Sequence, residues 1–519
     1  MKFGGVAAII SVVGHHTAAH NLYKYPPSHH FEESVQIASK KASSDASPID
    51  LRITRALGSK GYDYVRVSVI THTPEPPIAD FPFEYSSPFV GRWVAAFDLG
   101  ASSTTCSSDP ISSTSDVCDG DCILLCSNST ECQYYNFNED TKTCSLYDSC
   151  DFTPVKDATS VTYTKFGQNF LHSAVVKVNP GEKSTLKIDG TDVEVFLPKE
   201  NTATSGIVWS DPCISGRWVG CQQSDLALVR SVSMMNALSK DESWHYFQIL
   251  GDNFYDQDGR LTKSIWNGFN LEAKSKLLMT VPGNHDLWVA GGPDKSDNYD
   301  QFGWGFMQWY GQDAVASTIS ENGFLDFSVD VNANTSSVDF YERNSGLNFL
   351  WYNKVGGVGF MGFNGAALPD SESSYFKEAC AYFSGSSTQT IYVLGHWSKS
   401  TNYTDSDPIL GVPELRERLA TVDGCDIGDK LKYMDGHTHS NYMQEGGEKE
   451  SVGFMIGGHG MSGAGQYGFA YVKNSGDGED EVWYFEEFNT QGDDNYEAIL
   501  ECVKTKGVGS CTEYATRWL

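Results

Sequence analysis

The sequence predicts an α/β protein with a β-rich N-terminal region, and three observations lead to that fold class. From residue 204 to the end, short apolar runs such as YFQIL, LLMTV and IYVL alternate with helical stretches such as DLALVRSVSMMNAL, which is typical of strands buried in a sheet between helices. Before residue 204, segments such as YDYVRVSVI alternate apolar and polar residues with the period of half-buried strands. A cysteine-rich stretch interrupts these segments. We therefore expect three structurally different parts.

Length and charge limit what the protein can be. At 519 residues the chain is long enough for two or three domains, and a hydrophobic content of 40% supports packed cores. The 37 basic and 67 acidic residues give a net charge of −30, which argues against nucleic acid or an anionic membrane as the main partner. The same charge repels an anionic substrate at long range. A phosphate site in this chain must therefore be cationic locally, as bound metals would make it.

The first residues resemble a secretory signal. Residues 1–19 combine Lys2 with an apolar run and small residues, so we predict a signal peptide there, followed by a flexible, Ser- and His-rich leader at residues 20–50. No later stretch reaches the roughly 18 apolar residues of a membrane span. These features predict a secreted, extracellular protein, or one delivered to a vacuole or lysosome. Sequons at Asn128, Asn334 and Asn402 are compatible with glycosylation.

Residues 51–105 and 166–203 are expected to form a β-sandwich-like region. Turn signals separate its strand-like segments, the Pro-rich THTPEPP in the first part and NPGE and IDGT in the second. The cysteine-rich stretch at residues 106–165 falls between the two parts. The simplest account is one small sandwich that carries an inserted module.

The inserted stretch is dense in cysteine. Seven of the 13 cysteines lie between Cys106 and Cys150, a density typical of a disulfide-stapled module in an oxidising compartment. Cys118, Cys122 and Cys126 are spaced four apart and would share one face of a helix. A zinc site is a weaker interpretation, because the paired CxxC spacing that such sites prefer is missing.

A cysteine-bearing helix followed by the aromatic strand QYYNF and the segment TCSLY resembles the PAN/apple modules. The resemblance implies two disulfides, Cys122–Cys144 and Cys126–Cys132. It also implies that the module at residues 106–165 binds a protein or glycan ligand. This part of the chain therefore suggests attachment rather than chemistry.

Four motifs in the C-terminal part place metal-binding side chains directly after apolar runs. They are GDNFY at Gly251–Tyr255, GNHD at Gly283–Asp286, GHW at Gly395–Trp397 and GHTH at Gly436–His439. In open α/β sheets, active sites gather at the carboxyl ends of strands. Asp211 follows the run IVW in the same way, although alone it would be read as a turn residue before proline. The set predicts a two-metal hydrolytic centre.

Several side chains have roles that follow from their chemistry. Asp252 could bridge two cations, and the neutral amide oxygen of Asn284 would leave its metal Lewis acidic. His437 and His439 share a face in an extended segment, so both imidazoles can reach one centre. His285 could stay off the metals and donate a proton to a leaving group. Each motif alone has a plainer interpretation, a turn or a satisfied polar residue, and only the combination argues for a site.

The order of Asp211, GDNFY, GNHD, GHW and GHTH resembles the calcineurin-like metallophosphatases, and the tyrosine of GDNFY resembles the purple acid phosphatases in particular. The resemblance runs from Ile207 to about Gly465 and implies a catalytic domain at residues 204–519 with a four-layer α/β/β/α sandwich. It implies a first metal, Fe(III), held by Asp211, Asp252, Tyr255 and His439. It implies a second, divalent metal (Fe2+, Zn2+ or Mn2+) held by Asp252, Asn284, His396 and His437.

The resemblance implies a secreted purple-type acid phosphatase that hydrolyses phosphomonoesters. Two cations about 3.5 Å apart share a hydroxide, lower its pKa and hold the phosphate oxygens during in-line attack. The catalytic residues would be Asp252, which bridges the metals, and His285, which protonates the leaving alkoxide. A zinc- or manganese-dependent metallophosphodiesterase is the second hypothesis, because GHTH is shared with those enzymes. An adhesion protein with a phosphatase-like scaffold is the third.

Some residues depart from the family pattern. The first motif reads DPC, so Cys213 stands where related families often have His or Gly; we expect it to be disulfide-bonded, with Cys221 as a candidate partner. GHTH replaces the GHDH that is usual in purple enzymes. The Gly-rich segment GGHGMSGAG, which contains His459, either lines the rim of the site or forms a surface loop. These departures leave the substrate open.

Overall fold

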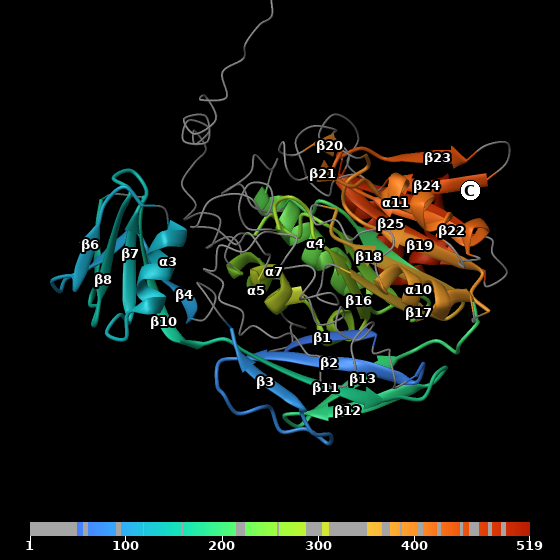
Figure 1. The fold of residues 1–519 in the computed structure, drawn as a ribbon. Coiled ribbons are helices and arrows are strands. Elements are labelled where there is room, and N and C mark those ends of the chain that lie inside the picture. The colour runs from blue at the N-terminus through green and yellow to red at the C-terminus, as the bar shows by residue number, and fades with distance from the viewer. Residues whose placement is uncertain are drawn as a thin grey trace, which may run out of the picture.

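The computed structural model describes most of the chain from residue 49 onward and shows a mixed α/β fold with large sheets and few helices (Figure 1). The described residues are 49–55, 61–89, 95–117, 119–156, 159–213, 224–256, 259–286, 304–310, 350–365, 374–384, 387–399, 401–402, 408–422, 427–446, 450–455, 467–475, 480–488 and 495–518. Outside them lie the predicted signal peptide, nearly all of the predicted leader, Cys118, Cys221, Asn334 and His459.

The largest element is a ten-stranded sheet. In spatial order its strands are β27 (Ala515–Trp518), β26 (Asp480–Phe488), β25 (Tyr467–Asn474), β14 (Thr204–Trp209), β15 (Tyr246–Leu250), β16 (Leu277–Val281), β1 (Asp50–Arg55), β2 (Tyr64–Thr71), β11 (Phe170–Lys177) and β3 (Tyr85–Pro88). β14, β15 and β16 are parallel neighbours and every residue in them is buried. Their uninterrupted apolar runs are therefore explained by burial on both faces.

The N-terminal β-rich region continues this sheet. β1 pairs in parallel with β16, with Ile53 opposite Leu277, and pairs in antiparallel with β2, which leads on to β11 and β3. These strands, expected in a separate sandwich at residues 51–105 and 166–203, instead share a sheet with the strands of the predicted catalytic domain. The physical reason is that all six residues of β1 are buried, which requires cover on both faces, as the interior of a large sheet provides.

A six-stranded sheet packs against the first one. Its order is β17 (Leu350–Val355), β18 (Val358–Phe363), β19 (Thr390–Leu394), β22 (Leu431–Asp435), β24 (Glu450–Met455) and β23 (Tyr442–Gly446). One apolar core holds side chains of both sheets. Within it, the rings of Tyr246 and Phe360 meet edge to face with centroids 5.0 Å apart. The hairpin of β12 (Lys183–Ile188) and β13 (Thr191–Phe196) adds apolar side chains to the same core.

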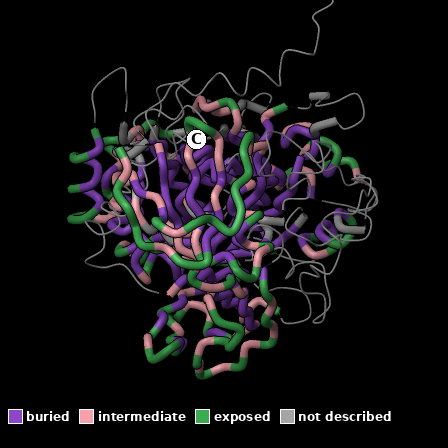
Figure 2. The backbone as a smooth tube through the Cα atoms, turned by 90° about the vertical axis from the view of Figure 1, so that its left-hand side faces the viewer, coloured by how far each residue is buried: buried purple, intermediate pink, exposed green. Residues whose placement is uncertain are grey.

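The helices pack into a second core. They are α4 (Ser224–Leu238), α5 (Arg260–Gly268), α6 (Leu271–Lys274), α7 (Trp304–Tyr310), α10 (Ser374–Ser384), α11 (Val412–Leu419) and α12 (Tyr496–Lys506). Their apolar residues join outward-facing residues of the sheets, and Figure 2 shows buried residues throughout the middle of the molecule. Short pieces complete the fold: η4 (Gly428–Lys430), η5 (Val508–Ser510), η6 (Thr512–Tyr514), β20 (Thr401–Asn402) and β21 (Pro408–Ile409). Among the helices of the described residues, none combines the length and apolar character needed to cross a bilayer.

The cysteine-rich region forms a unit with its own core, to the side of the large sheets (Figure 1). Its five-stranded sheet has the order β4 (Ala95–Ser102), β10 (Ser160–Gln168), β7 (Tyr134–Asn138), β8 (Thr143–Tyr147) and β6 (Ser112–Thr114). α3 (Asp119–Asn128) packs on this sheet through Cys122, Ile123 and Cys126, and β5 (Thr104–Cys106) pairs with β9 (Phe152–Pro154). Since β4 and β10 are part of the sheet, the unit extends beyond residues 106–165 at both ends.

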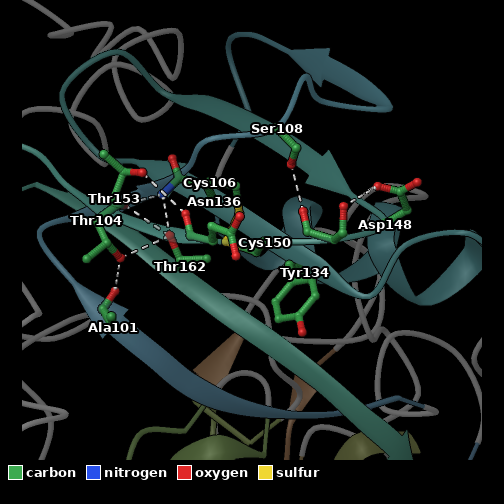
Figure 3. Close-up of a disulfide and its surroundings, with 12 residues drawn as sticks. Ala101, Thr104, Cys106, Ser108, Tyr134, Asn136, Asp148, Cys150, Thr153 and Thr162 are labelled. Carbon is green, nitrogen blue, oxygen red and sulfur yellow. Dashed lines mark hydrogen bonds between the residues drawn. A yellow bond between two sulfur atoms is a disulfide. The ribbon is translucent and has the colours of Figure 1, made fainter.

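Three disulfides hold this unit together. Cys122–Cys144 and Cys126–Cys132, the two pairs implied by the resemblance, are both present and are confirmed. The third, Cys106–Cys150, joins residues 44 apart in the sequence and links the end of β5 to the segment just before its partner strand β9 (Figure 3). The disulfide-rich character is therefore as predicted.

Candidate metal centre

The predicted ligands follow the carboxyl ends of parallel strands in both sheets. Asp211 comes after β14, Asp252 after β15 and Asn284 after β16. In the six-stranded sheet, His396 comes after β19 and His437 after β22. Because parallel strands present their carboxyl ends at one edge, loops that are far apart in the sequence meet there.

Left-handed backbone is concentrated in these loops. Asp211, Asp252, Tyr255, His437 and His439 have φ between 50° and 69°. Such conformations cost of order 1–3 kcal/mol each in non-glycine residues and persist only where the surrounding structure enforces them. Strain gathered in the predicted ligand loops is typical of a functional site.

Two glycines permit the close approach of these loops. Gly251 has a φ of 90°, and a Cβ there would lie 2.5 Å from Nδ1 of His396. A Cβ on Gly283 would lie 2.2 Å from Oδ1 of Asp252. Any side chain at either position would push a predicted ligand away. The glycines that begin GDNFY and GNHD are therefore part of the site's construction.

Asp211, Tyr255 and His439 form one group. The Tyr255 hydroxyl donates to Oδ1 of Asp211 at 3.3 Å and lies 3.2 Å from Nε2 of His439. That nitrogen is 3.3 Å from the same carboxylate oxygen. The other oxygen, Oδ2 of Asp211, accepts from the backbone N–H of His437 at 2.9 Å and from the hydroxyl of Ser210. Oδ1 is thereby left facing the group.

Asn284, His396 and His437 form a second group. Oδ1 of Asn284 lies 3.1 Å from Nε2 of His396 and 3.0 Å from Nδ1 of His437, and the two nitrogens are 3.1 Å apart. Nδ1 of His396 lies 2.9 Å from the backbone oxygen of Leu250, so Nδ1 carries a proton and donates it. A carbonyl that fixes one ring nitrogen and leaves the other for the site is the usual support of a metal-binding histidine.

Asp252 contacts both groups. Its Oδ2 is 3.4 Å from Nε2 of His396, and the same carboxylate interacts with the Tyr255 hydroxyl. Ligand atoms of Asp211, Asp252 and His396 all lie within 4.8 Å of one another. Asp252 therefore occupies the position that a bridging ligand requires.

The buried charges of the site are strongly coupled. Burial works to raise the pKa of Asp211 and of Asp252, but His396, together with His439 at Asp211 and His285 at Asp252, outweighs it and holds both pKa values below the ordinary range. Burial lowers the pKa of His396, and the Asp252 and Asp211 carboxylates more than reverse this, raising it to about 10. Burial, followed by His396, lowers the pKa of His437 to about 4. One shared proton thus compensates two buried carboxylates.

The donor set fits metal ions. Burial, then the charges of Asp252 and Asp211, raise the pKa of Tyr255 well above 10, so its phenol keeps its proton in the metal-free protein. A cation of high charge would reverse this balance and favour the phenolate. Carboxylate, phenol, amide and imidazole donors without a thiolate suit Fe(III), Zn2+ or Mn2+.

His285 lies beside the ligands and outside both groups. Its backbone N–H donates to Oδ1 of Asp252 at 2.8 Å, and its ring centroid is 4.7 Å from that of Tyr255. Its Nδ1 is buried without a hydrogen-bond partner among the described residues. Its role as proton donor remains a prediction.

Sequence reasoning missed the residues that support the ligands. Asp286 is fully buried, and its carboxylate accepts from the backbone N–H and side-chain amide of Asn253 at 2.8 and 2.9 Å and from the N–H of Gly283 at 2.7 Å. Burial, then Asp252, raise the pKa of Asp286 to about 7, against the effect of these donors. The available signal was an acidic residue directly after an apolar strand in a glycine motif. Cys213 is disulfide-bonded, as predicted.

Comparisons with known proteins assign the chain to no family. No protein-family model and no curated protein matches the chain. Among solved structures, the chain is similar to a purple acid phosphatase isolated from yellow lupin (Lupinus luteus) seeds, with 12% sequence identity and a TM-score of 0.44 over 85% of this chain and 72% of that chain. At this level of similarity, activity has to be argued from the site itself.

Proposed function

We propose that the chain is a metal-dependent phosphoric ester hydrolase of the purple acid phosphatase type, acting on phosphomonoesters. The observation that carries the proposal is the convergence of the predicted ligands, from five separate loops, on two buried carboxylates that lie within reach of one another. Such a cluster is unfavourable unless cations compensate it. The proposal includes a four-layer α/β/β/α sandwich as the architecture of the catalytic domain.

Each group of ligands would hold one metal. The first metal, Fe(III), would be held by Asp211, Asp252, Tyr255 and His439. The second, divalent metal would be held by Asp252, Asn284, His396 and His437. When bound, the metals supply Lewis acidity toward the phosphate oxygens and acidify water for in-line attack.

The chain's own residues position the metal ligands and the proton donor. Asp252 would be the ligand shared by the two metals, because its carboxylate contacts His396 of one group and Tyr255 of the other, while Oδ1 accepts from the His285 backbone. The same bond places His285 next to the bridging ligand, where its imidazole can protonate the leaving alkoxide. Burial of Tyr255 excludes water from the phenol, which strengthens its interaction with a cation.

The chain's remaining properties suit a secreted enzyme. Disulfides such as Cys122–Cys144 and Cys502–Cys511 persist in oxidising compartments. With a net charge of −30, the protein needs the metals to attract a phosphate ester. The disulfide-rich unit, as a PAN/apple-like module, would bind a protein or glycan. A zinc or manganese phosphodiesterase is the second candidate, favoured by GHTH in place of GHDH.

Tyr255→Phe tests the purple assignment. A tyrosinate bound to Fe(III) absorbs visible light, so the oxidised wild-type protein should be coloured and the variant should lose the band while remaining folded. Turnover of an aryl phosphomonoester against a bis-aryl phosphodiester across pH separates the two candidates. A colourless wild-type protein with diester preference would reject the purple phosphatase, and persistence of the band in Tyr255→Phe would show that the ligand assignment is wrong.

A further inference from the structure

The loop between β15 and α5 carries two predicted ligands in an unusual backbone. Asp252, Phe254 and Tyr255 have φ of 52°, 65° and 53°, and the loop runs from Gly251 to Gly259, both also at positive φ. Three non-glycine residues in this region cost of the order of several kcal/mol together. Contacts outside the ligand set must therefore hold the loop in place.

The Asp252 side of the loop is held by Asp286. Its carboxylate accepts from both the backbone and the side chain of Asn253, the residue after Asp252, and from the backbone of Gly283. It thus fastens GDNFY to GNHD, so that Asp252 and Asn284 keep a fixed separation. Two backbone N–H groups and one side-chain amide thus fix the position of this buried side chain.

The Tyr255 side is held by Asp256, the next residue. Its carboxylate is 1% exposed and accepts from the backbone N–H of Gly259 at 3.0 Å and of Thr262 at 2.8 Å, which ties the loop to the first turn of α5. The Thr262 hydroxyl in turn lies 2.6 Å from the hydroxyl of Tyr310 on α7. The end of the loop nearest Tyr255 is therefore anchored to two helices.

Phe254 gives the loop a fixed point between these carboxylates. Its side chain is fully buried, with its ring centroid 6.4 Å from that of Trp266 and 6.5 Å from that of Tyr310. Because this ring cannot shift easily in a packed core, a change at one end of the loop is not passed on fully to the other end. The two ends can then be perturbed separately.

We propose that Asp286 and Asp256 are positioning residues for the two ends of this loop. Asp286 holds the bridging ligand Asp252 in position, and Asp256 holds the phenol of Tyr255 in position. The proposal rests on the proposed function, since it assumes that these side chains hold metals. It predicts that loss of Asp286 weakens both metal sites. Loss of Asp256 weakens only the site of the first metal.

The test compares Asp256→Asn, Asp286→Asn and a matched control, Asp241→Asn. Asp241 also accepts two backbone N–H bonds, from Ser243 at 2.8 Å and Val508 at 2.7 Å, in a loop that contributes no predicted ligand. In each variant the amide keeps the shape of the side chain and loses the charge. Measured are metal content per chain, the rate at which a chelator removes each metal, the visible spectrum and the melting temperature.

Asp256→Asn should speed the loss of the first metal and shift the visible band, while the divalent metal is retained as in wild type. Asp286→Asn should weaken retention of both metals. Changes in supporting residues of metal sites typically lower metal affinity about 10- to 100-fold. Asp241→Asn should lower the melting temperature and leave both metals and the spectrum unchanged.

The proposal is overturned if Asp256→Asn changes only the melting temperature, as the control does, or if it releases both metals equally. If Asp256→Asn does not fold, Tyr310→Phe replaces it in the test. This variant removes only the hydroxyl that contacts Thr262 and should cause a smaller loss of the first metal. A folded Tyr310→Phe protein that loses none of the first metal rejects the role of Asp256. A wild-type protein that holds two metals without a visible band rejects the purple assignment, and chelator release still tests the two carboxylates.

Discussion

The metal centre and the disulfide-rich unit both bury polar side chains, but they stabilise them by different means. In the disulfide-rich unit the buried polar cluster around Asn136 consists of neutral groups. The side-chain amide of Asn136 donates to the backbone oxygen of Thr104 at 2.8 Å and to the hydroxyl of Thr162 at 2.9 Å (Figure 3). It also donates to the backbone oxygen of Val161 at 3.1 Å and accepts from the Ser160 hydroxyl at 3.1 Å. Every polar atom of that amide is satisfied, and covalent bonds close the unit.

In the metal centre the buried groups are charged, and protein groups do not fully compensate them. Asp211 and Asp252 share one imidazolium, and five nearby positions have strained backbone. This difference indicates which of the two regions depends on bound ions and on pH for its stability. The disulfide-rich unit should be stable as it stands, whereas the metal centre should depend on metals and on pH. The predictions below test this contrast.

The largest effect is expected from the bridging ligand. Asp252→Asn removes a carboxylate that contacts both ligand groups, so phosphomonoester hydrolysis should fall more than about 100-fold, beyond the 10- to 100-fold range of supporting residues. Steady-state kinetics and metal content check this. The disulfide-rich unit should keep its hydrogen-exchange protection in this variant. Activity within tenfold of wild type would contradict the role of Asp252.

The second prediction perturbs the disulfide-rich unit and leaves the metal centre unchanged. Replacing Cys106 and Cys150 by serine removes the disulfide beside the β5–β9 pair and should destabilise the unit by about 2–5 kcal/mol. Denaturant unfolding followed by hydrogen exchange within residues 95–168 measures this loss. Metal content and kcat should remain as in wild type. A parallel loss of metals would show that the two regions are not independent.

Acid should act on the sheet that carries the metal centre through His245, which precedes β15 and contacts the start of β14, at the opposite strand ends from the ligands. Burial, then Lys276, lower the pKa of His245 to about 4. The unfolded chain binds a proton near pH 6.5 and the folded chain does not, so stability is complete above pH 6.5 and falls as the pH drops toward 4, by up to about 3 kcal/mol.

His245→Gln removes this titration, so its melting temperature should fall less between pH 6.5 and 4 than that of wild type, measured with metals at saturation. An identical pH dependence in the two proteins would show that His245 does not contribute. Metals that bind only the folded state would offset this loss.

Local patterns in the sequence identified the candidate ligands, and the resemblance to PAN/apple modules implied two disulfides that the structure contains. Neither could predict how the strands are paired. Asp211 and the four motifs were recognisable because each follows a buried apolar run. The place of β1 was not, because its partner β16 lies more than two hundred residues away (Ile53 opposite Leu277) and alternation does not say which sheet a strand joins. Asp256 and Asp286 have no visible role until the loops meet in space.

The central claim is that the buried carboxylates and imidazoles hold two metals, one of them iron. The most direct test is elemental analysis of the purified protein, with moles of each metal measured per mole of chain. We expect two metals per chain, one of them iron and the other iron, zinc or manganese, with both lost in Asp252→Asn. A protein with no metal after reconstitution with iron and zinc, or with metals that remain in Asp252→Asn, would contradict it.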